Sequence, residues 1–163
     1  MAKIYTIALF LLLGVGAVSA EAATLSFSQS ADSYGVGSTF SVGVYTGSSD
    51  QAMNAASGVV SFPSDKLEVV SLSKTGSIFS LWVQEPSFSN SGGTVSFEGI
   101  VLNPGFTGGS GKILTITFRA KALGEANLSF TSGSVLANDG TGTNILTDLR
   151  TAVISITAKS SPL

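Results

Sequence analysis

The feature that most constrains this chain is a two-residue alternation of apolar and polar side chains that recurs along most of its length. After residue 22, apolar residues occur in short runs separated by turn-forming residues about every 8–12 positions, and never with a helical period. The clearest run is Ile113–Lys121, in which every second residue from Leu114 onward is apolar. Because successive side chains of a strand point to opposite faces, each such run predicts a strand with one face to bury.

About nine strands are expected from these runs. We place them around Leu25–Phe27, Phe40–Val44, Gly58–Phe62, Leu67–Val70, Trp82–Phe88, Thr94–Val101, Ile113–Lys121, Leu128–Phe130 with Val135 and Leu136 following, and Ala152–Ile156. The fifth and sixth runs predict a hairpin around Asn90–Gly93, and Pro86 predicts an edge position or a bulge because proline cannot donate to the ladder. Strands with one solvent-exposed face and one buried face favour an all-β, antiparallel two-sheet sandwich. A barrel is the alternative.

The N-terminus has the organisation of a secretory signal peptide. Lys3 precedes a short apolar run, Ile7–Val18, and small residues follow at the predicted cleavage points after Ala20 or Ala22. The alternative is a permanent membrane anchor, but the run is shorter than the roughly 20 residues that a bilayer span needs. The sequence therefore predicts a signal peptide over 1–22, one secreted domain over 23–158 without a membrane span, free or attached to the cell surface, and a tail or linker start over 159–163.

Composition excludes several classes of function. The chain has no cysteine, which excludes disulfides, thiol nucleophiles and cysteine-bound metals, and it has no histidine, which excludes Ser-His-Asp chemistry. Charged residues make up only 11% of the chain, the net charge is −2, and the Lys and Arg residues are dispersed, so no basic stripe is present to bind nucleic acid. We expect a protein that is not an enzyme.

Three segments resemble the cohesin domain family: the alternating strand Phe40–Val44, the segment Val60–Val70 with its proline-ended strand and Ser-Asp-Lys turn, and the strand Gly111–Phe118. Their order and spacing are similar to those of cohesin domains across nearly the whole mature chain. This resemblance implies a nine-stranded jelly-roll sandwich, allied in fold to bacterial cellulose-binding modules. It also implies a non-catalytic receptor that docks dockerin modules. Because the similar positions are mainly core positions, no recognition residue is carried over.

Two glutamates are the candidates for a binding site. If the predicted hairpin turns near Ser91 and Gly92, Glu85 and Glu98 lie almost opposite each other across the ladder. A carboxylate pair at that spacing suits glycoside hydrolysis. Both are expected on the solvent face, however, where no burial separates their pKa values. We therefore interpret them as part of a polar partner-binding face and expect no catalytic residue.

A calcium site is considered at the segment 138–144, Asn-Asp-Gly-Thr-Gly-Thr-Asn. Asn138, Asp139 and Asn144 offer side-chain oxygens, which calcium prefers. The segment has a single carboxylate, and the same residue types form ordinary turns. We expect a turn here and no cofactor, with calcium as the alternative.

Two further segments bear on function. Trp82 is the single tryptophan; we expect it in the core, with a flat sugar-binding platform as the alternative. The glycine-rich segment 103–111 lacks the phosphate-loop pattern and is expected to be a mobile connection between strands.

The leading interpretation is an exported protein-binding module of cohesin type with a dockerin-like partner. The alternatives are a carbohydrate-binding module linked to polysaccharide degradation and a structural domain at the cell surface. An array of exposed aromatic side chains would favour sugar, whereas a flat patch of Ser, Asn and acidic residues would favour a protein partner.

Overall fold

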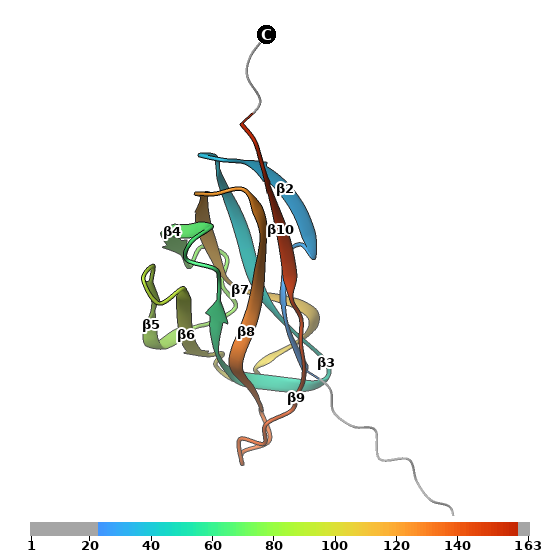
Figure 1. Ribbon diagram of the computed structural model, residues 1–163. Helices are drawn as coiled ribbons and strands as arrows, with labels where there is room; N and C mark the ends of the chain where they lie inside the picture. The colour runs from blue at the N-terminus through green and yellow to red at the C-terminus, as the bar shows by residue number, and fades with distance from the viewer. Residues whose placement is uncertain (1–22, 160–163) are drawn as a thin grey trace, which may run out of the picture.

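The computed structural model describes residues 23–159, and within them the regular secondary structure consists of β-strands alone. The predicted signal peptide and the end of the tail lie outside the described residues. No helix in the described part of the chain is long and apolar enough to cross a membrane. The strands, shown in Figure 1, are β1 (Ala23–Phe27), β2 (Ala31–Gly35), β3 (Thr39–Ser61), β4 (Leu67–Ser73), β5 (Leu81–Ser89), β6 (Thr94–Ile100), β7 (Phe106–Ala120), β8 (Gly124–Ala137), β9 (Leu146–Leu149) and β10 (Ala152–Thr157).

A single long strand, β3, belongs to both layers of the structure. Its first half pairs with β1 and β7, as in Val42 opposite Ile116, and its second half pairs with β6 and β8, as in Val60 opposite Val95. Register shifts between residues 44 and 53 mark the change from one layer to the other. The first layer has the order β9-β1-β3-β7-β4, and the second has the order β5-β6-β3-β8-β10-β2. The predicted all-β sandwich is confirmed.

Aromatic rings from the two layers meet in the core. Phe118 of β7 has no exposed surface, and Phe62, just after β3, packs edge-on against it with ring centroids 5.3 Å apart. Phe27 of β1 stacks on Phe130 of β8 at 4.7 Å. These rings occupy positions that alternate with polar residues along their strands, so the two-residue period predicted which side chains fill the core.

The chain ends depart from the predicted antiparallel pairing. β1 runs parallel to β9, and β2 runs parallel to β10, so the two end segments lie side by side in each layer. Neither β2 nor β9 was expected from the sequence. β2 is Ala-Asp-Ser-Tyr-Gly and β9 has four residues, and neither shows the apolar alternation by which the other strands were recognised.

The expectation of a mobile connection over 103–111 is wrong in its second half. β7 already begins at Phe106, and Gly108 and Gly111 pair with β3 through an irregular register. The ring of Phe106 lies against Gly111, where a Cβ atom would be only 2.7 Å from the Cζ atom of the ring. A glycine-rich sequence is typical of a loop because it has no alternating apolar and polar side chains. In this strand the absence of a side chain at Gly111 leaves space for the ring of Phe106.

β5 is an edge strand, and it is irregular where the proline predicted. It pairs with β6 alone, and its register shifts between Trp82 and Gln84 and again between Gln84 and Ser87, the interval that contains Pro86. Ser89 lies opposite Thr94, which confirms the hairpin around Asn90–Gly93. Irregular, proline-bearing edges resist pairing with another chain.

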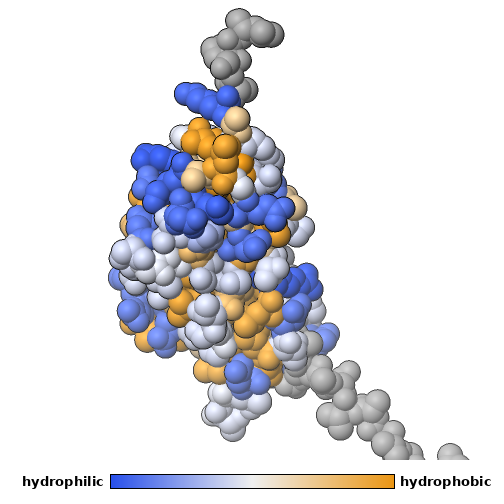
Figure 2. All heavy atoms as spheres, in the orientation of Figure 1, coloured by the Kyte–Doolittle hydropathy of each residue, from blue (hydrophilic) through white to orange (hydrophobic). Residues whose placement is uncertain are grey.

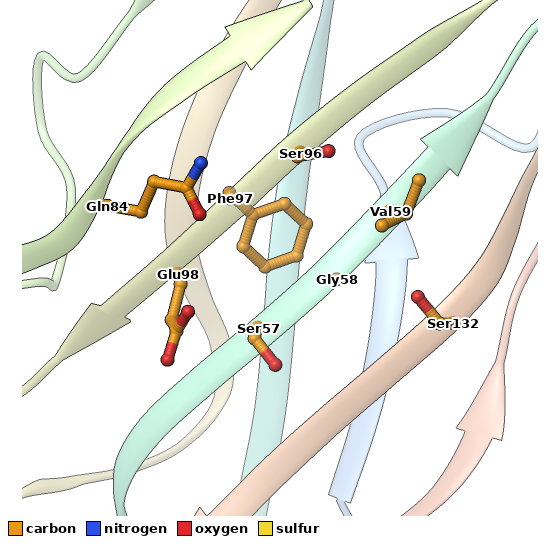
Figure 3. A pocket seen from close by; sticks show the side chains of 8 residues that line it. All are labelled: Ser57, Gly58, Val59, Gln84, Ser96, Phe97, Glu98 and Ser132. Carbon is orange, nitrogen blue, oxygen red and sulfur yellow. The ribbon is translucent and has the colours of Figure 1, made fainter.

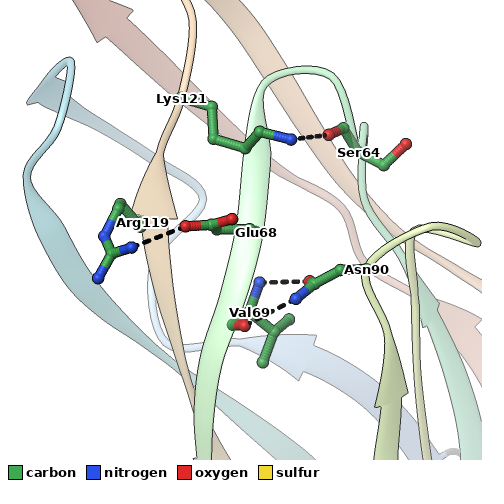
Figure 4. A network of polar contacts seen from close by, with 6 residues as sticks. All are labelled: Ser64, Glu68, Val69, Asn90, Arg119 and Lys121. Atoms are coloured by element: carbon green, nitrogen blue, oxygen red, sulfur yellow. Dashed lines mark hydrogen bonds and ion pairs between the residues drawn. The ribbon is translucent and has the colours of Figure 1, made fainter.

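Asn90, in the turn of this hairpin, closes the free edge of β4. The Val69 N–H donates to Asn90 Oδ1 at 2.7 Å, and Asn90 Nδ2 donates to the Val69 carbonyl at 3.0 Å (Figure 4). One amide side chain thus replaces a strand neighbour for both backbone groups of a buried residue. On the outer side of the same strand, Arg119 pairs with Glu68 at 2.9 Å.

Replacing Asn90 with alanine should lower the free energy of unfolding by about 1–2 kcal/mol, because it leaves the N–H and carbonyl of Val69 without partners. The measurement is urea unfolding followed by tryptophan fluorescence. Asn127→Ala, at an exposed position of β8, is the matched control and should change stability by less than about 0.5 kcal/mol. Equal losses in the two variants would contradict this role for Asn90.

Candidate functional site

The outer side of the second layer presents rows of small polar residues across four strands. One row consists of Gln84, Glu98, Ser57 and Ser134, which oppose one another in turn from β5 to β8. We call the outward residues of β5, β6, the second half of β3 and β8 the serine face. It comprises Leu81, Gln84, Ser87 and Ser89; Thr94, Ser96, Glu98 and Ile100; Ala55, Ser57, Val59 and Ser61; and Ser132, Ser134 and Leu136.

The alternation of β6 explains why these residues point outward. Val95, Phe97 and Gly99 are buried in the sandwich, so Thr94, Ser96 and Glu98 must face solvent. At one end of the face a row of apolar residues crosses the strands, from Leu81 through Ile100 to Leu136. Leu81 is 56% exposed, so this row offers an apolar anchor beside the polar ones.

A depression of about 240 Å³ lies in the middle of the serine face. Gln84, Ser96, Glu98, Ser57 and Ser132 surround it, and its remaining lining comes from Val59, Gly58 and Phe97 (Figure 3). Figure 3 shows Gln84 and Glu98 on neighbouring strands, with Ser57 beside Glu98 on the next one. The depression is open to solvent and is formed by the surface of a sheet.

The structure separates the two candidate glutamates. The register shift in β5 places Gln84, and not Glu85, opposite Glu98, so the expected glutamate pair is wrong. Glu85 instead forms an ion pair of 2.6 Å with Lys74, whose ammonium also lies 5.7 Å from the ring centroid of Trp82. Glu98 is exposed on the serine face, as predicted, and lines the depression without Glu85.

Most polar side chains around the depression are not used within the molecule. Ser57 and Ser134 share a hydrogen bond of 2.9 Å. The side chains of Gln84, Ser96 and Glu98, by contrast, have no hydrogen-bond or ion-pair partner anywhere in residues 23–159. On the outer side of the first layer, Glu68 pairs with Arg119 and Ser41 pairs with Thr117. Gln84, Ser96 and Glu98 are therefore free to bond with a partner molecule.

The calcium candidates are occupied in holding a turn. Asn138 Nδ2 donates to the Pro104 carbonyl at 2.9 Å, and Asn144 Oδ1 accepts from the backbone N–H of Val135 at 3.2 Å. Asp139 accepts hydrogen bonds within its own loop, from Thr141 and Gly142 backbone N–H groups and from the Thr143 hydroxyl. The segment thus forms the expected turn. No cluster of three or more His, Cys, Asp or Glu side chains occurs in the described range.

The same bonds lower the pKa of the Asp139 carboxyl. The hydrogen bond from Thr143, followed by that from the Thr141 backbone, holds the pKa of this carboxyl well below its usual range. A carboxyl whose pKa is lower in the folded state stabilises the fold above its unfolded pKa of about 3.9, and this contribution is lost as the pH falls through the folded pKa. An NMR titration of the carboxyl carbon should give a midpoint below 3.9, and Thr143→Val should raise it. A midpoint unchanged by that substitution would contradict the assigned cause.

Comparison with known proteins identifies the family. The family model of the cohesin domain matches residues 26–156, which is most of the chain. The chain belongs to the cohesin domain family. The resemblance found in the sequence is therefore confirmed. None of the curated proteins compared with the sequence matches it.

Solved structures share the fold of this cohesin domain at low identity. CaCohA2 from Clostridium acetobutylicum has a TM-score of 0.70 and 15% identity, over 86% of this chain and 94% of that chain. A non-cellulosomal cohesin from the archaeon Archaeoglobus fulgidus has a TM-score of 0.63 and 20% identity, over 83% and 91%. The OlpA cohesin of Clostridium thermocellum, solved as a type I cohesin–dockerin complex, has a TM-score of 0.65 and 15% identity, over 82% and 99%.

Aromatic residues of this cohesin domain do not form a row on its surface. Trp82 lies opposite Gly99 on the inner side of β5 and packs edge-on against Phe79 at 5.0 Å, so it points inward as expected, but it is only partly buried at the margin of the core. Among the described residues, Phe88, 44% exposed, is the single aromatic among the exposed large hydrophobic side chains. Figure 2 shows hydrophobic atoms in separate patches among hydrophilic and intermediate residues. The described residues therefore show no array of exposed aromatic rings, the feature that would favour sugar.

Sequence reasoning found Glu98 but missed Gln84, Ser57, Ser96 and Ser132. Serine is abundant throughout this cohesin domain, so no single serine stood out. These four residues could have been identified only from the cross-strand register. That register depends on pairings between β3, β6 and β8, which the local alternation does not specify.

Proposed function

We propose that this cohesin domain is a non-catalytic binding module that holds a dockerin-type protein module on its serine face. The observation that carries the proposal is the depression, where free polar side chains gather beside an exposed apolar row. Specific interfaces combine a few anchoring contacts with surrounding complementary surface, and this face offers both. Cohesins of the same fold, such as the OlpA cohesin, were solved in complex with dockerins, which supports the partner class.

An ion pair on the first layer and the depression on the second distinguish the two outer faces. On the first layer the ion pair Glu68–Arg119 would have to be broken or covered by a partner. On the serine face a partner would meet the side chains of Gln84, Ser96 and Glu98, which have no bonding partner within residues 23–159. We propose further that the module acts outside the cell, after removal of the leader predicted over 1–22.

The proposal is tested by blocking each face with one large side chain. Ser96→Tyr places a ring beside the depression on β6, and Thr117→Tyr places the same ring on the outer side of β7 as the matched control. Binding to a panel of purified dockerin modules is measured by isothermal titration calorimetry, with the fold checked by circular dichroism. Ser96→Tyr should weaken binding at least about tenfold, and Thr117→Tyr less than about threefold.

Two outcomes would contradict the proposal. The first is a panel in which no dockerin module binds the unmodified chain. The second is binding that is blocked by Thr117→Tyr and tolerates Ser96→Tyr, because the partner would then occupy the first layer.

A further inference from the structure

Charges are distributed unequally over the strands that form the serine face. β3, β5, β6 and β8 contain the acidic residues Asp50, Glu85, Glu98 and Glu125, and they contain neither lysine nor arginine. Lys74 neutralises Glu85 from a neighbouring loop. The acidic residue in the depression therefore lies within a face that has no positive charge of its own.

Covering the depression would bury the Glu98 carboxylate. It forms no ion pair with any residue in 23–159. A carboxylate that is removed from water without a counter-charge is strongly destabilising, whereas one that meets a cation and hydrogen-bond donors is tolerated. A partner seated on this face must therefore supply a positive group at Glu98.

The other lining groups specify which cation suits the depression. The Gln84 carbonyl oxygen and the hydroxyls of Ser57, Ser96 and Ser132 can all accept hydrogen bonds around the same space. A guanidinium has five N–H donors in one plane, and an ammonium has three donors on one nitrogen. Several acceptors spread around a carboxylate are matched better by the wider, planar group.

We propose that the depression receives an arginine side chain of the partner, whose guanidinium pairs with Glu98 and donates to Gln84 and the surrounding serines. This inference rests on the proposed function, because it assigns the chemistry of the residue that the partner inserts. Glu98 is then the specificity-determining residue of the face, and Glu85 has no part in it.

A small probe tests the depression without a partner protein. N-acetyl-arginine methylamide is titrated into the ¹⁵N-labelled chain, and amide chemical shifts are followed by NMR. The largest shifts should map to the strands around Glu98. Glu98→Gln, which keeps shape and removes charge, should weaken the probe at least about tenfold. Glu125→Gln, the same change at an exposed end of β8, should leave it within about twofold.

Two analogues separate the charge from its geometry. The citrulline analogue is neutral and nearly isosteric, and it should produce no saturable shifts at these strands. The lysine analogue should bind at least about threefold more weakly than the arginine probe. Shifts that are spread over the surface, or that persist in Glu98→Gln, overturn the site; equal binding of lysine and arginine overturns the assignment to a guanidinium.

The dockerin experiment distinguishes this inference from the proposed function. If a dockerin module binds and Ser96→Tyr blocks it, the proposed function stands. Glu98→Gln should then weaken the same complex at least about tenfold, and Glu125→Gln should not. A complex that is blocked by Ser96→Tyr and indifferent to Glu98→Gln overturns the arginine inference alone.

Discussion

Replacing Phe118 with alanine should lower the free energy of unfolding by about 3–5 kcal/mol. Phe118 has no exposed surface, and it joins the two layers through Phe62 while also lying 5.8 Å from the ring of Phe40. Removing its ring leaves a cavity between layers that are held apart by their other side chains. Because domains of this size are stable by only about 5–15 kcal/mol, the loss is a large part of the total.

Chemical denaturation followed by circular dichroism measures this effect. The matched control is Phe88→Ala, since Phe88 is 44% exposed at the end of the edge strand β5. It should cost less than about 1 kcal/mol. Comparable losses in the two variants would mean that contact between the layers is not what stabilises the sandwich.

Replacing Gly99 with valine should lower the free energy of unfolding by about 1–3 kcal/mol and expose Trp82. The ring of Phe79 lies directly on Gly99, so that any Cβ atom there would collide with it. Phe79 is buried and packs edge-on against Trp82, the residue that opposes Gly99 on β5. Displacing the Phe79 ring therefore removes a packing partner of Trp82 on the edge strand beside the depression.

Tryptophan emission reports this displacement directly, because Trp82 is the single tryptophan of the chain. The emission maximum should shift to longer wavelength in Gly99→Val. Gly109→Ala is the control, because the nearest atom to a Cβ there is Ser49 Oγ at 3.8 Å. It should leave both emission and stability nearly unchanged. An unshifted emission maximum in Gly99→Val would show that Phe79 can move without disturbing β5.

The local alternation correctly predicted that Glu98 points outward. It did not predict correctly that Gln84, and not Glu85, lies opposite Glu98. In β6 the alternation is unbroken, so the burial of Val95 and Phe97 places Glu98 on the outside. In β5 the register shifts before and after Gln84, and each shift changes which residue lies opposite β6. A bulge changes the partner of a residue by one position without changing its sequence neighbours, so a count of residues from the turn could not detect it.

The amino-acid sequence by itself determined the features that follow from the burial of every second side chain. It determined the all-β class, the core positions such as Phe118 and the inward direction of Trp82, whereas the family was indicated separately, by the resemblance of three segments to cohesin domains. These depend on contacts that any strand of that period makes with a buried layer, whichever strand lies beside it.

The tertiary structure alone decided what depends on pairing between distant segments. The parallel contacts of β1 with β9 and of β2 with β10 join residues more than 100 positions apart. The depression likewise requires Gln84, Glu98, Ser57 and Ser132 to meet across four strands. Such pairings are selected by the packing of both layers together, and the local alternation is equally compatible with other strand orders and registers.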